Sequence, residues 1–85
     1  DLEAIAGNGE VSFTFSKPTG ATKVILQQST DKSKWTTANT GTLDKDSTSA
    51  TVKGLTNGQK YYFRLVVTGG SRAGESNIVS ATPSD

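Results

Sequence analysis

Hydrophobic and polar residues alternate along most of this chain with a period of two, which is the pattern of half-buried β-strands. The strongest case is residues 60–68, where Tyr61, Phe63, Leu65 and Val67 would share one face of a strand. Strands are predicted at residues 2–6, 11–15, 22–28, 35–37, 47–53, 60–68 and 76–82. Short strands at this spacing, separated by turn-forming residues, indicate an all-β sandwich.

The turn before the sixth predicted strand carries the most specific local signal. Gly54 and Leu55 follow the fifth strand, and Tyr61 lies at the start of the sixth. Between them, Asn57 and Gly58 are residue types that favour tight turns. This arrangement predicts a corner between two sheets, with Tyr61 as a structural residue. The predicted core consists of Val11, Phe13, Phe15, Val24, Leu26, Val52, Leu55, Tyr61, Phe63, Leu65 and Val79.

Taken together, these features make the whole chain resemble a fibronectin type III domain. The resemblance rests on residues 11–15, 54–55, Tyr61, 74–77 and 79–83. It implies an all-β, seven-stranded immunoglobulin-like β-sandwich. It also implies that the Tyr61 hydroxyl bonds to backbone upstream of it and that Leu55 fills the core from the turn.

Three positions depart from the usual pattern of that family. Phe15 stands where a tryptophan is usual, Val24 where an aromatic residue is common, and Asn57-Gly58 where a proline is frequent. These differences would make the core smaller but leave it apolar.

The outer face of the sandwich carries a second candidate feature. The resemblance implies that the third, sixth and last strands are neighbours in one sheet. Ile25, Tyr62, Arg64, Val66 and Ile78 would then form a semi-apolar outer patch. One hypothesis is that this patch contacts a neighbouring domain or partner. The alternative is that such side chains simply favour strands and are scattered on the surface.

Trp35, the single tryptophan, has two readings. It could offer a flat ring for stacking against a sugar at a sheet edge. The alternative is that it packs across the fourth strand and closes the edge of the sandwich.

Composition and charge exclude several classes of function. An 85-residue chain holds one domain at most, and the net charge of +1 leaves no basic stripe for nucleic acid. No apolar run approaches the ~20 residues of a membrane span, so no membrane insertion is predicted. Since cysteine is absent, neither a disulfide framework nor a thiolate zinc site can form.

Catalysis is not expected from these residues. Histidine and cysteine are both absent, which removes the commonest general base and the Ser–His and Cys–His nucleophile pairs. The carboxylates of Asp44 and Asp46 are interpreted as solvated loop residues, too few for calcium. No catalytic residue, cofactor or metal site is predicted.

The resemblance implies a non-catalytic spacer or interaction module, residues 1–85, cut from a larger secreted bacterial protein that degrades glycans or sits on the cell surface. The alternative is an adhesive or decorating module, including one on a phage virion. The expected location is extracellular. Expected partners are neighbouring domains and a polysaccharide or cell-surface component, and the isolated domain is expected to be monomeric.

Overall fold

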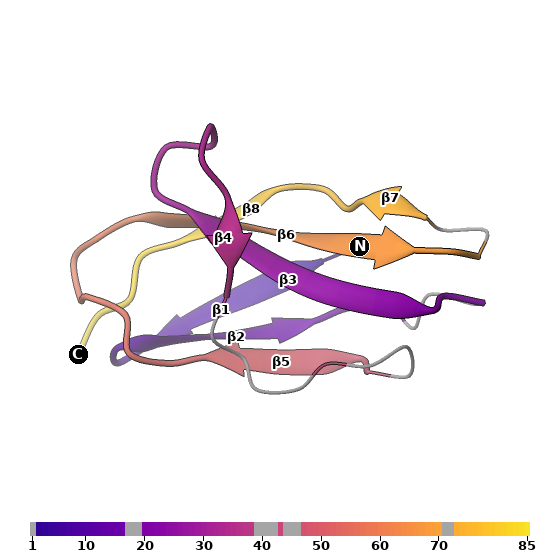
Figure 1. Ribbon diagram of the computed structural model, residues 1–85. Coiled ribbons are helices and arrows are strands. Elements are labelled where there is room, and N and C mark those ends of the chain that lie inside the picture. The colour runs from indigo at the N-terminus through magenta and orange to yellow at the C-terminus, as the bar shows by residue number, and fades with distance from the viewer. Residues whose placement is uncertain (1, 17–19, 39–42, 44–46, 71–72) are drawn as a thin grey trace.

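The protein is an all-β sandwich of two antiparallel sheets (Figure 1), seen in a computed structural model that describes residues 2–16, 20–38, 43, 47–70 and 73–85. The smaller sheet has the order β1-β2-β5, formed by β1 (Glu3–Gly7), β2 (Glu10–Thr14) and β5 (Ser49–Val52). The larger sheet has the order β4-β3-β6-β7, with β8 also paired to β6. Its strands are β3 (Lys23–Ser29), β4 (Thr36–Thr37), β6 (Tyr61–Thr68), β7 (Gly74–Glu75) and β8 (Val79–Ala81). The predicted fold class is confirmed.

The core lies between the two sheets and is centred on an aromatic pair. Phe13 of β2 and Phe63 of β6 meet edge to face, with ring centroids 4.7 Å apart. Because strand side chains alternate, β6 sends every second residue inward, from Tyr61 to Val67. The predicted core residues are buried except Leu55 and Val79, which are partly buried and pack against the core. Leu2, Ala21, Ala38 and Pro83 are buried as well, which the alternation did not predict.

The predicted last strand, residues 76–82, is shorter than expected, because only Val79–Ala81 (β8) forms a strand within it. The two-residue strand β7 (Gly74–Glu75) lies just before that range and was not predicted, so the described residues contain eight strands. Strands β7 and β8 pair with the same edge of β6, which is interrupted between them. The interruption lies at Ser76, whose hydroxyl oxygen accepts a hydrogen bond from Leu65 N at 2.9 Å. A side-chain oxygen thus occupies a place that a backbone carbonyl fills in a regular ladder, and the edge is displaced locally.

The corner before β6 is held by Tyr61. Its hydroxyl oxygen accepts a hydrogen bond from Thr56 N at 3.0 Å, five residues upstream. Leu55 N donates to Gly9 O at 3.0 Å, which ties the same turn to the β1–β2 hairpin. The contact implied for Tyr61 is present, while Leu55 covers the end of the core without being fully buried.

Both terminal segments are tied to the body of the sandwich. The side-chain amide of Asn77 accepts a hydrogen bond from Leu2 N at 3.0 Å and donates one to Leu2 O at 3.1 Å. Near the other end, Ser84 N donates to Gly7 O at 3.1 Å, and Gly58 N donates to Pro83 O at 2.8 Å. These contacts explain why Leu2 and Pro83 are buried although they lie beyond the strands.

The hydrogen bond at the corner predicts a difference between the two adjacent tyrosines. Tyr61→Phe should lower the free energy of unfolding by about 1 kcal/mol, because Thr56 N loses its acceptor. Tyr61→Ala should cost about 3–5 kcal/mol, because it also removes a buried ring. Tyr62→Phe is the matched control and should change stability little. Urea unfolding measures all three, and an equal loss for both Phe variants would contradict the role given to Tyr61.

Candidate functional site

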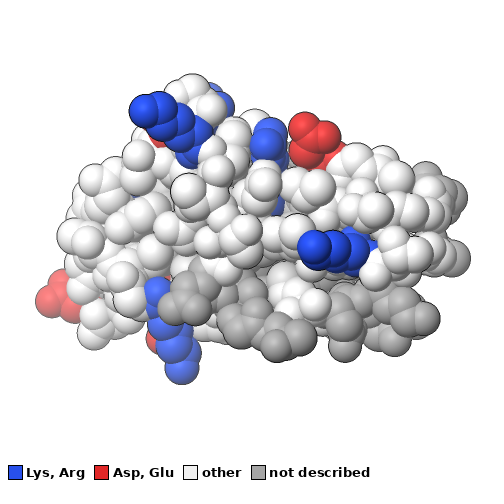
Figure 2. Space-filling view, in the orientation of Figure 1, with Lys and Arg blue, Asp and Glu red and all other residues white. Residues whose placement is uncertain are grey.

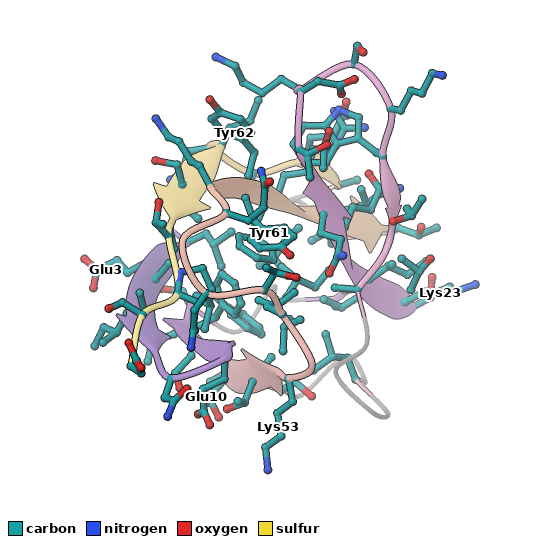
Figure 3. The ribbon with its side chains drawn as sticks, turned by 90° about the vertical axis from the view of Figure 1, so that its left-hand side faces the viewer. Glu3, Glu10, Lys23, Lys53, Tyr61 and Tyr62 are labelled. Atoms are coloured by element: carbon teal, nitrogen blue, oxygen red, sulfur yellow. The ribbon has the colours of Figure 1, made fainter. Side chains whose placement is uncertain are left out.

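The candidate site is the outer face of the larger sheet, formed by the outward side chains of β3 and β6, by Trp35 and by the segment 75–80. Tyr62, Arg64 and Val66 of β6 are half-buried and face away from the core, and Ile25 of β3 is paired with Val66. Ile78 lies just before β8 and is 48% exposed. Figure 3 shows Tyr61 pointing between the sheets and Tyr62 pointing the opposite way. The structure therefore places all five predicted patch residues on this face.

Arg64 organises the middle of the outer face. Its guanidinium carbon lies 4.3 Å from the centroid of the Trp35 ring, and its Nε donates to Gln27 Oε1 at 2.9 Å. Its Nη1 lies 3.6 Å from Glu75 Oε1. One side chain thus links β3, β6, β7 and the residue before β4. Because its Nε and Nη1 both contact residues of the same domain, Arg64 helps to hold these strands together.

Trp35 lies on the outer face of the larger sheet. The ring reaches across β3 to the guanidinium of Arg64 on β6, so it covers the outer face instead of closing the sandwich edge. A cation over an indole face is a favourable arrangement. Since Arg64 occupies one face of the ring, a sugar could stack only on the other face. The glycan contact at Trp35 stays a prediction.

Tyr62 is the centre of a second cluster, at the end of β6 nearest the corner. The Lys32 Nζ lies 5.1 Å from the centroid of its ring, and the Lys60 Nζ lies 5.4 Å from it. Neither lysine was among the predicted patch residues. Lys60 could have been predicted, because it lies two residues before Tyr62 and residues at that spacing in a strand share one face. Lys32 comes from the distant β3–β4 loop and had no such signal.

The β3–β4 loop that carries Lys32 is built around two short polar side chains. The buried Ser29 Oγ accepts hydrogen bonds from the backbone N of Asp31 and of Lys32, at 3.1 and 2.9 Å. Asp31 Oδ1 accepts from the backbone N of Ser33 and of Lys34, at 2.9 and 3.0 Å. The N–H of Lys34, followed by that of Ser33, lowers the pKa of Asp31 from 3.8 to about 2. Figure 2 shows Lys and Arg side chains projecting over this loop.

The described residues contain no group of three His, Cys, Asp or Glu side chains that could hold a metal ion. In the same part of the chain, no helix is long and apolar enough to cross a membrane. Asp44 and Asp46, considered above as carboxylates, lie outside the described residues.

Comparison with solved structures decides the fold family. The FN1–FN3 domains of chicken contactin-1 resemble the chain with a TM-score of 0.65 and 22% sequence identity. The match covers 96% of this chain and 31% of that chain. The chain has the fibronectin type III fold. Domains with the fibronectin type III fold are typically non-catalytic. No protein-family model matches the chain, and no curated protein matches it in sequence.

The lowered pKa of Asp31 predicts a pH dependence of the β3–β4 loop. The folded-state pKa lies below the unfolded value, so the carboxylate stabilises the fold above pH 3.8, and this contribution is lost as the pH falls through about 2. The amide resonances of Ser33 and Lys34 should shift with a midpoint near the lower value, because their acceptor becomes protonated. Asp31→Asn should lack that transition, and its persistence in the variant would contradict the assignment.

Proposed function

We propose that this domain is a non-catalytic module of a longer extracellular bacterial protein, in which it spaces and orients its neighbouring domains. The observation that carries the proposal is the anchoring of both terminal segments. Leu2 is held by the amide of Asn77, and Ser84 is held by Gly7. A domain attached at either end would therefore be joined to a fixed point on the sandwich instead of a free tail.

The shape of the domain suits this role. Its longest dimension is 37 Å, and the two ends of the chain lie toward opposite ends of that axis (Figure 1). Neighbours attached there would be held apart along the axis. The similar solved structure is a chain with several domains, FN1 to FN3, of which this chain covers 31%. That arrangement supports a place in series with other domains.

The bacterial and extracellular parts of the proposal rest on the cysteine-free sequence and on residues 6–11, 20–22 and 29–31, which resemble the corresponding segments of bacterial fibronectin type III domains. A glycan-degrading or cell-surface protein is the proposed parent. The absence of histidine and cysteine supports a module that leaves catalysis to another domain.

The anchoring of Leu2 predicts that Asn77→Ala loosens the arrangement of domains in the full protein. Small-angle X-ray scattering should show a broader distribution of interatomic distances, because the segment entering β1 loses both hydrogen bonds. Asn57→Ala is the matched control, since the Asn57 amide also makes two hydrogen bonds, to Gly9 N and to the side chain of Asn8. An unchanged distribution for Asn77→Ala would remove the support for a spacer.

The outer patch predicts a separate effect on orientation. Ile78→Asp places a charge on the outer face, whereas Ile5→Asp places one on the opposite sheet, where Ile5 is 72% exposed. If the outer face contacts a neighbouring domain, scattering from the full protein should change for Ile78→Asp alone. Equal profiles for both variants would show that the patch makes no such contact.

A further inference from the structure

A shallow depression of about 260 Å³ lies beside Tyr62 on the outer face, between the β3–β4 loop and the segment leading into β8. It is lined by Lys32, Tyr62, Ile78, Val79 and Ser80. Its walls include an aromatic residue, the exposed Ile78, a serine and a lysine, while the side chain of Val79 packs against the core. A mostly apolar concave surface with a few polar groups is the usual form of a small binding site.

Two lysines lie around Tyr62, one of them lining this depression, and among the described residues neither has a salt-bridge partner. The ammonium groups of Lys32 and Lys60 both lie within 5.4 Å of the centroid of the Tyr62 ring. No carboxylate of the described residues forms a salt bridge with either of them, since the ion pair found there joins Arg64 to Glu75. Asp31, in the same loop, already has its Oδ1 engaged by backbone N–H groups. An added anion would be attracted by these ammonium groups.

The backbone at Lys32 gives an independent reason to see a ligand site. Its φ is 65°, and it is the one non-glycine among the described residues with a positive φ. That conformation favours glycine or asparagine, and a lysine there carries a conformational cost. The hydrogen bonds of Ser29 and Asp31 hold the loop in this shape. Strained residues of this kind are concentrated at ligand contacts. Here the strain brings a cation over Tyr62.

We propose that Tyr62, Lys32 and Lys60 form a binding site for an acidic polysaccharide. The apolar surfaces of Tyr62 and Ile78 that line the depression match the C–H groups of a sugar, and the exposed Ser80 hydroxyl can hydrogen-bond its hydroxyl groups. The ammonium group of Lys32, which lines the depression, matches a carboxylate or sulfate on the sugar unit, and Lys60 adds positive charge beside the same ring. The short depression fits one such unit, whereas an extended peptide would need a longer groove or a free strand edge.

This proposal is independent of the spacer role. A domain can hold its neighbours apart whether or not it binds a glycan, and it can bind a glycan whether or not its ends are anchored. Retention by polysaccharide therefore tests the site, while scattering from the full protein tests the spacer.

The test is gel electrophoresis of the 85-residue chain through gels containing polygalacturonate, dextran sulfate, neutral dextran or polyglutamate. The chain should be retarded by at least one acidic polysaccharide, with weaker retardation at higher salt, and not by dextran. The stronger of the first two polymers identifies the acidic group as carboxylate or sulfate.

Substitutions separate the site from a general effect of charge. Lys32→Gly with Lys60→Gln should lower the affinity by about tenfold or more. Glycine accepts the backbone conformation at position 32, so the fold is not at risk. Lys23→Gln with Lys53→Gln removes the same charge elsewhere and should retain binding. Tyr62→Leu should lose binding, while Tyr62→Phe should keep it.

Three results would overturn the proposal. The first is an absence of retardation by both acidic polysaccharides. The second is an equal loss of binding in the two double-lysine variants, which would show that net charge alone is responsible. The third is retardation by polyglutamate that matches the polysaccharides and survives Tyr62→Leu, which would indicate an acidic protein as the partner.

Discussion

Phe13 and Phe63 join the two sheets of this domain, and no disulfide shares that task. Both rings are almost completely buried, and the inward residues of β2 and β6 pack around them. A short chain buries a limited core, so each large side chain in it contributes a substantial part of the stability. The corner at Tyr61 extends the same aromatic cluster, because its ring lies 6.3 Å from that of Phe63. The position of β6, and with it everything on its outer side, follows from these contacts.

Strand β6 has two functions that are separated by the alternation of its side chains. Its odd-numbered residues close the core, while Tyr62 and Arg64 form the two clusters of the outer face. Arg64 contacts Trp35, Gln27 and Glu75, and these contacts hold its side chain in place. Tyr62 has the ammonium groups of Lys32 and Lys60 as its cationic neighbours and borders an open depression. On the outer face, Arg64 is therefore held by contacts within the domain, whereas the lysines beside Tyr62 have no salt-bridge partner among the described residues.

The sequence predicts well what depends on local periodicity and poorly what depends on the path of distant segments. The faces of β3 and β6, the corner at Tyr61 and most of the core follow from alternation and turn residues. The interruption at Ser76 does not, because a serine hydroxyl replaces a carbonyl only when the edge follows one particular path. Trp35 stacks on Arg64, and Lys32 approaches Tyr62, although the residues of each pair are about thirty positions apart in the sequence. Alternation with a period of two describes neighbouring residues of one strand and therefore cannot predict such contacts.

The ties at the two ends of the chain run along one seam of the sandwich. Leu2 is bonded to Asn77, and five residues later Gly7 is bonded to Ser84, so β1 and the final segment advance in the same direction. A pull on opposite ends of the chain would slide these two segments past each other. The bonds along the seam would then share the load and rupture together, whereas bonds in a hairpin opened from one end break one after another. The seam gives the domain resistance to stretching along the axis on which its neighbours would pull.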